Sequence, residues 1–245
     1  MNVKIISVIL VLALASLACG FTIELPPQAQ TGPDVEESIT VADPESDETR
    51  LSLNFGAGEL RLSSGAEGLV EGTALYNVDQ LKPEIIKNGG NIEIKQGDLD
   101  GLLPADKMKN RWDLQLGNTP MDLEIDAGAY EGNMDLGGLA LKSLTVKDGA
   151  AQVNLSFSEP NLIEMSHMSY STGASEVTLS DLANANFSTF DFDSGAGSYT
   201  LDFSGELQRD ASVKIDSGLS ELILIVPDGV NATVTIEGGL TDINT

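Results

Sequence analysis

Apolar and polar residues alternate along most of the chain, and the alternation recurs at a regular interval. Apolar pairs stand five and three residues before each of a series of glycines, and further pairs stand four and six residues after most of them. An alternation with a period of two is typical of a strand with one buried face. The pattern predicts two strands per repeat, joined at a corner glycine. The corner glycines are Gly56, Gly128, Gly149, Gly173, Gly195, Gly218 and Gly239.

From Gly128 onward these glycines are 21 to 24 residues apart. Glycine adopts positive φ without steric cost, and the small Ala that often follows it permits close stacking, so we expect a tight corner at each position. A coil of about 22 residues cannot hide its own apolar face, and successive coils must therefore share a core. We predict an all-β fold in which residues 117–245 form a parallel β-solenoid.

Residues 50–116 interrupt this spacing, because Gly56 and Gly128 are 72 positions apart. Shorter apolar stretches in this region predict further strands. The open end of a solenoid exposes unpaired strand edges that need cover. We therefore predict that residues 50–116 form an N-terminal β cap domain. Trp112 shares the alternation of Leu114 and Leu116, so we expect it in the core.

The first residues have the features of a bacterial export signal. An uncharged run of about 14 residues ends at Ala18, which is shorter than the ~20 residues needed to span a bilayer. Cys19, the only cysteine of the chain, follows directly and resembles the cysteine of a lipobox. We predict that residues 1–19 are a lipoprotein signal and anchor, and that Cys19 attaches the protein to the outside of a bacterial membrane. The alternative is an ordinary signal peptide that is removed together with Cys19.

Residues 20–49 are rich in proline and acidic residues and poor in apolar ones. Such a segment buries too little apolar surface to offset the entropy of ordering, so we predict a disordered acidic tether. The chain has 38 acidic and 13 basic residues and a net charge of −25. Nucleic-acid binding depends on neutralising phosphates with Lys and Arg, and we therefore expect no nucleic-acid partner.

Several strings within the folded part are similar to those of a known family. The strings are LNFGAGEL at 53–60, GTALYN at 72–77, LKPE at 81–84 and WDLQLG at 112–117. They resemble the bacterial toast-rack family, which is similar in its C-terminal part to the domain of cell-wall-active antibiotic response proteins. The resemblance covers residues 50–245. It implies parallel β-solenoid rungs, an envelope location and a link to envelope stress sensing, but no catalytic activity.

The sequence offers little catalytic or metal-binding chemistry. His167 is the only histidine and lies outside the slots predicted to be buried, so hydrolytic triads lack their base. Asp126, Asp193 and Asp216 recur two residues before a corner glycine, and Asp148 one residue before. We expect these carboxylates to accept hydrogen bonds within the turns, with calcium binding as the alternative. We predict that the protein is not an enzyme and uses no cofactor.

Two kinds of function remain after these exclusions. The favoured one is a non-enzymatic, lipid-anchored envelope protein whose solenoid acts as an interaction or adhesion scaffold. The alternative is a module that binds a glycan or a small ligand of the cell envelope. The candidate face for such a ligand is a flat polar ladder in one outward slot, formed by Asn133, Asn154, Thr178 and Thr200.

The alternation fails near the C-terminal end, where outward slots that are polar in earlier coils hold Ile223 and Ile225. A strand that is apolar on both faces is normally covered on both faces. One candidate cover is the segment that follows Pro227. Otherwise, the two isoleucines form part of an exposed interface for a partner protein or for a second copy of this chain.

Overall fold

The structure, a computed structural model, describes residues 31–46, 48–97 and 107–235. In this part of the chain the regular elements are twelve strands and two short 3-10 helices, which confirms the predicted all-β class. The strands are β1 (Val35–Val41), β2 (Thr49–Ser64), β3 (Val70–Tyr76), β4 (Pro83–Asn88), β5 (Asn91–Gln96), β6 (Asn110–Leu116), β7 (Met121–Asp135), β8 (Leu141–Ser156), β9 (Met165–Ser180), β10 (Phe187–Asp202), β11 (Ser212–Ser217) and β12 (Ser220–Ile225). The helices are η1 (Asp79–Leu81) and η2 (Leu182–Ala185). Neither of them is long or apolar enough to cross a membrane.

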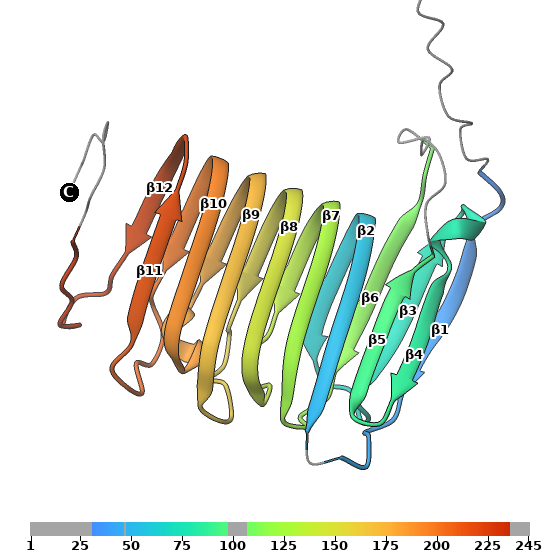
Figure 1. Cartoon of the computed structure of the whole chain (residues 1–245), viewed down its shortest axis with the longest axis horizontal. Helices are drawn as coiled ribbons and strands as arrows, with labels where there is room; N and C mark the ends of the chain where they lie inside the picture. Colours follow the sequence, from blue (N-terminus) through green and yellow to red (C-terminus); the bar gives the residue numbers. More distant parts are fainter. Residues whose placement is uncertain (1–30, 47, 98–106, 236–245) are drawn as a thin grey trace, which may run out of the picture.

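The long strands β2, β7, β8, β9 and β10 stack side by side in parallel. Each has 15 or 16 residues and bends near its middle, so that it contributes one arm to each of two facing walls (Figure 1). We call each bent strand a rung and the series the rung stack. The last described rung, which we call the end rung, is divided into β11 and β12, which pair with the two arms of β10.

The slots that the alternation predicts to be buried lie next to each other from rung to rung. Leu123 pairs with Leu144, and Leu144 pairs with Met168. After the bend, Val153 pairs with Val177, and these side chains are as fully buried as those before it. Each rung therefore covers the apolar side chains of the next, and one continuous core runs along the stack.

The shorter N-terminal strands cover the first rung. β5 pairs in parallel with one arm of β2 and β6 with the other, and antiparallel strands follow on each side: β4 on β5, β3 on β6 and β1 on β3. The opposite edge of β2 pairs with β7 along both arms. The predicted boundary at 116/117 is therefore not a structural break, because β2 lies within the predicted cap and is also the first rung of the stack.

Part of the predicted tether is a strand instead. β1 pairs residue by residue with β3, and Ile39 and Val41 are buried in the main core. The prediction of disorder failed here because an edge strand needs apolar residues at alternate positions only. Glu36 is exposed, and Glu37, which has the same parity as Ile39, is half-buried and accepts a hydrogen bond from Tyr76 Oη at 3.1 Å. Even before β1, the Gly32 amide donates a hydrogen bond to the Asn77 carbonyl at 2.7 Å. The part of the predicted tether from 20 to 30 lies outside the described residues.

Buried asparagines hold the loops that connect one rung to the next, at the ends of the rungs opposite the bends. The Asn161 amide donates to the carbonyls of Leu141 and Ile163 at 2.9 and 2.8 Å, and its oxygen accepts a bond from the Leu141 amide at 2.9 Å. Asn184, 23 positions later in the sequence, donates to the Phe157 carbonyl at 2.8 Å. Because these side chains satisfy backbone groups that no strand partner reaches, the connections can be buried without leaving unpaired polar atoms.

Candidate functional site

Six of the predicted corner glycines form a column along the bends of the rungs. They are Gly56, Gly128, Gly149, Gly173, Gly195 and Gly218, and a Cβ atom on any of the last five would lie within 3.0 Å of the carbonyl oxygen of the preceding glycine. Their positions are as predicted, but the expected positive φ is wrong, because none of the six has it. Glycine is needed because the rungs approach closely at the bend and leave no room for a side chain. Gly239 and Cys19 lie outside the described residues.

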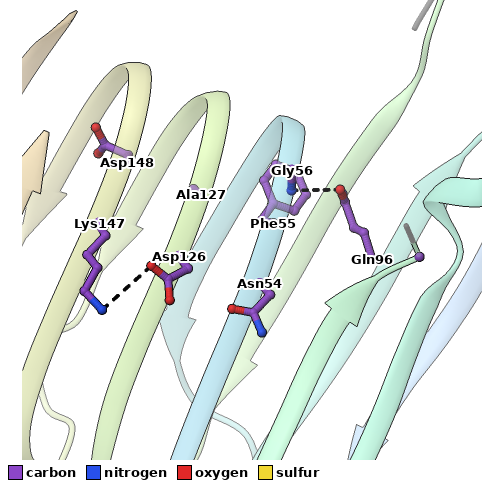
Figure 2. Close-up of a pocket in the computed structure, with 9 residues that line it drawn as sticks. Asn54, Phe55, Gly56, Gln96, Asp126, Ala127, Lys147 and Asp148 are labelled. Carbon is purple, nitrogen blue, oxygen red and sulfur yellow. Dashed lines mark hydrogen bonds and ion pairs between the residues drawn. The ribbon is translucent and has the colours of Figure 1, made fainter. Parts of the chain in front are cut away.

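A shallow hollow lies beside the bends of the first rungs (Figure 2). The Gly56 amide donates a hydrogen bond of 2.8 Å to Gln96 Oε1, so the end of β5 covers the first corner. Lys147 is the one lysine that lines the hollow, and its Nζ lies 2.8 Å from Glu124 Oε1 and 4.0 Å from Asp126 Oδ1. The hydrogen bond to Glu124 and the charge of Asp126 raise the pKa of Lys147 above its ordinary value. The lysine is therefore already held by carboxylates and is poorly suited to capture an anion.

Asp148 differs from the other corner carboxylates because its side chain accepts hydrogen bonds from the next rung. Tyr170 Oη donates to Asp148 Oδ2 at 2.7 Å, and the Thr172 hydroxyl donates to Oδ1. Burial raises the pKa of Tyr170, so this tyrosine stays protonated and remains a donor. These contacts tie β8 to β9 under the bend, and we assign Asp148 a structural role.

The remaining corner carboxylates share one outward column. Asp126 pairs with Lys147, Lys147 with Ser171, Ser171 with Asp193, and Asp193 with Asp216. The sequence spacing thus places them in one row as predicted, with Lys147 and Ser171 interrupting it. In the part of the chain that the structure describes, no three potential His, Cys, Asp or Glu ligands come together. The row therefore lends no support to the calcium alternative.

His167 and Trp112 lie where the sequence predicts them. His167 is on the outer surface of β9, where its Nδ1 is 2.9 Å from Thr189 Oγ1 and its Nε2 is 3.9 Å from Asp191 Oδ2. Trp112 is fully buried and packs edge-on against Phe55, with a distance of 5.1 Å between the ring centroids. Neither residue lines the hollow beside the bends.

The predicted polar ladder is present on the outer face of the second arms. Asn133 pairs with Asn154, Asn154 with Thr178, and Thr178 with Thr200. The two asparagines are exposed and the two threonines are half-buried. The ladder is therefore a flat, uncharged strip on a molecule with a net charge of −25.

The end rung leaves inward-facing apolar side chains uncovered. Val213 and Leu224 are each 37% exposed, although they occupy slots that are buried in the other rungs. Their partners in β10, Phe190 and Leu201, are fully buried. The difference arises because no strand among the described residues stacks on the far side of the end rung.

The outward isoleucines of the end rung are also exposed. Ile223 is 45% and Ile225 is 42% exposed, and Val226 beside them is 41% exposed. Within the described segment after Pro227, which extends to residue 235, nothing covers them. Val234, which stands five residues before the predicted corner Gly239, is itself 59% exposed. The end rung thus presents an apolar surface on both its inner and its outer side.

Some of the contacts in the structure were not predicted from the sequence. Asn161 and Asn184 are separated by one repeat, so a search for polar residues at repeat spacing would have found them. The bond from Gly56 to Gln96 could not be found in this way, because it joins the rung stack to an inserted strand. The contact of Tyr170 with Asp148 depends on how the bend aligns two rungs, which alternation alone does not specify.

The architecture defines an all-β protein built as a stack of parallel rungs, with antiparallel strands over one end. The chain belongs to the toast-rack family: the model described as the N-terminal domain of toast_rack, DUF2154, matches residues 30–165 and 160–225. This confirms the resemblance seen in the sequence. Among curated proteins, no match to the chain is found.

Two solved structures resemble this chain to different degrees. One, from Clostridium sporogenes ATCC 15579, is described provisionally as a cell adhesion protein; it is 24% identical with a TM-score of 0.62, over 78% of this chain and 99% of that one. Another, from Bacteroides fragilis NCTC 9343, is described provisionally as an adhesin; it is 12% identical with a TM-score of 0.32, over 81% of this chain and 100% of that one. The first of these supports the fold, and the second is too distant to carry an argument.

Proposed function

We propose that this protein is a non-enzymatic, lipid-anchored envelope protein whose rung stack is a β-solenoid that serves as an interaction or adhesion scaffold. The observation that carries the proposal is the end rung, which presents apolar side chains on a molecule that is otherwise strongly acidic. Exposed apolar patches on soluble domains commonly mark interaction sites. The Clostridium sporogenes structure that shares the fold is itself described provisionally as a cell adhesion protein, which agrees with this role.

The polar side chains favour a scaffold over an enzyme. Lys147, Asp148 and His167 are each engaged by neighbours on the preceding or the next rung. An active site usually combines a concave, partly desolvated pocket with groups whose pKa values suit proton transfer. The hollow at the bends is shallow, and the carboxylates beside it hold the lysine in its charged form.

The position of Cys19 in the chain determines which end of the scaffold is tethered to the membrane. Cys19 and Gly32, the first described residue with a backbone hydrogen bond into the folded part, are 13 positions apart. Even a fully extended chain of that length spans only about 45 Å. A lipid on Cys19 would therefore hold β1 and the N-terminal strands near the bilayer, and the end rung would lie at the opposite end of the stack (Figure 1).

The anchor and the scaffold can be tested together in living bacteria. Metabolic labelling with a fatty-acid analogue should mark the wild type and leave Cys19→Ser unmarked, and the variant should leave the membrane fraction. Cells that display the wild type should also attach to one another or to a solid support several-fold more than cells with Cys19→Ser. An unlabelled, freely secreted wild type would contradict the anchor, and equal attachment would contradict the scaffold.

The flat polar ladder supports the second candidate, a glycan-binding module. If purified protein bound envelope glycans and lost that binding in Asn154→Ala with Thr178→Ala, while its melting temperature stayed unchanged, the ladder would be the working surface. The proposed scaffold predicts instead that these two substitutions leave attachment unchanged.

A further inference from the structure

The end rung has a free edge on both arms. β11 and β12 pair with β10 on one side, and in the described part of the chain no strand pairs with them on the other. The unpaired amide and carbonyl groups of such an edge form a template for a further strand. Because the inward side chains Val213 and Leu224 are exposed as well, an occupant would cover both the edge and the end of the core.

The opposite end of the stack carries charged residues on both of its edge strands. Ile39 and Val41 of β1 are fully buried, and Glu36 and Glu37 add charge to this strand. On the other arm the edge is β4, where Ile85 and Ile86 are 36% and 37% exposed but stand between Glu84 and Lys87. Charged residues on edge strands discourage pairing with other chains. A lipid on Cys19 would also place this end near the membrane, so the end rung is the surface that remains accessible to other molecules.

A molecule that binds the end rung must pair with the free strand edges of both arms at once. It must present two strands with the same separation as β11 and β12, each with apolar residues directed toward the core. The segment 227–235 does not do so, since it forms no strand and its Val234 is exposed. The end rung of a second copy meets the requirement, because its two arms have the same separation and the same alternation.

The charge of the end rung also favours a second copy of this chain. Two whole molecules with a net charge of −25 repel each other, whereas the end rung, residues 212–225, has one lysine and two acidic residues, a sum of 1 − 2 = −1. In an antiparallel pairing of β11 with itself centred on Ile215, Lys214 lies opposite Asp216 of the second copy. Opposite charges placed across a strand pair stabilise it.

We propose that the end rung docks against the end rung of a second copy of this chain, in an antiparallel, two-fold arrangement. The pairing of β12 is centred on Ile223, which places Leu222 opposite Leu224 of the second copy and buries both. Two-fold contacts of this kind close after two molecules and form no fibres. The inference rests on the proposed function, because the anchor turns these ends away from the membrane, where two molecules on facing surfaces can meet.

The first test measures the mass of the full chain in detergent by light scattering, with the contribution of the detergent subtracted. The wild type should be a dimer, and Ile223→Asp with Ile225→Asp should weaken dimerisation at least about 100-fold, because like charges then face each other across the two-fold axis. The matched control, Asn154→Asp with Ser156→Asp, adds the same charge to the same two columns three rungs earlier and should remain dimeric.

The reciprocal variant identifies the partner as a second copy. Ile223→Lys should also be monomeric alone, because two lysines then face each other on the two-fold axis, but an equal mixture of this variant with Ile223→Asp should form dimers again, because opposite charges now meet there. A monomeric wild type, a dimeric Asp variant, or a mixture that stays monomeric would each overturn the proposal. None of these results bears on the lipid anchor, so failure here and failure of the proposed function are distinguishable.

A crosslinking test uses no charged substitution, so its result does not depend on how well the charged variants fold. Ile223→Cys places a thiol on the two-fold axis, where mild oxidation of intact cells should produce a covalent dimer of the full chain. Asn154→Cys is the control and should stay monomeric, and the wild type, whose one cysteine is Cys19, gives the background. Equal crosslinking of the two variants would overturn the arrangement.

Discussion

Gly195→Val is expected to destabilise the protein by about 3 kcal/mol or more, which lowers the melting temperature by on the order of 10 °C. A Cβ atom at this position would lie within 3.0 Å of the Gly173 carbonyl oxygen. The obstacle is backbone on the neighbouring rung, so no side-chain rotation can relieve the clash, and the two rungs must separate. Thermal unfolding followed by circular dichroism measures the effect.

The matched control is Ala196→Val, one position further along the same bend. Ala196 is exposed, and a larger side chain there can extend into solvent. The control should melt within a degree or two of the wild type. If Gly195→Val did the same, the rungs would be further apart at the bend than the structure places them, and the role of the glycine column would be wrong.

Trp112→Ala should be comparably severe, with a loss of about 3–5 kcal/mol in the free energy of unfolding. Trp112 lies on β6 and packs against Phe55 on the first rung, so its removal opens a cavity between the N-terminal strands and the rung stack. Urea unfolding followed by two probes, one for each region, measures the loss. Both probes should report a single transition, because one core joins the two regions.

Trp112→Phe is the control for the role of the ring. The indole Nε1 is buried and forms no hydrogen bond with protein atoms, so Phe removes an unsatisfied donor while it keeps most of the aromatic contact. This variant should lose less than half as much stability as Trp112→Ala. Two separate unfolding transitions in the wild type would show that the N-terminal strands and the rung stack are independent units.

The repeat could be predicted in detail because each coil must bury its side chains against the next. Residues such as Leu144 and Met168 alternate with polar neighbours, and this periodicity determines which face of the strand is buried. The same spacing placed Trp112 in the core and Asn154 beside Thr178 on the outer face. Inference from side-chain periodicity succeeds wherever a residue's environment repeats from rung to rung.

The predictions that failed depend on contacts that do not repeat. β1 is a strand because β3 offers it an edge, and a local reading of the acidic segment around Glu36 and Glu37 cannot show this edge. The corner at Gly195 was located correctly, but its backbone angle was not, because the need for glycine arises from the neighbouring Gly173. The exposure of Ile223 was one of two alternatives that the sequence left open, because alternation does not show what lies against the outer face of a strand.

The central claim is that one stack, with charged edge strands at its N-terminal end, presents an open and apolar end rung for association. Hydrogen–deuterium exchange of the intact protein, measured strand by strand at several protein concentrations, tests this most directly. We predict slow exchange in β2, β7, β8, β9 and β10 at every concentration, and exchange in β12 that slows as the concentration rises, because its outer edge becomes paired. Exchange in β12 that is independent of concentration, or slowing that occurs in β1 instead, would contradict the account.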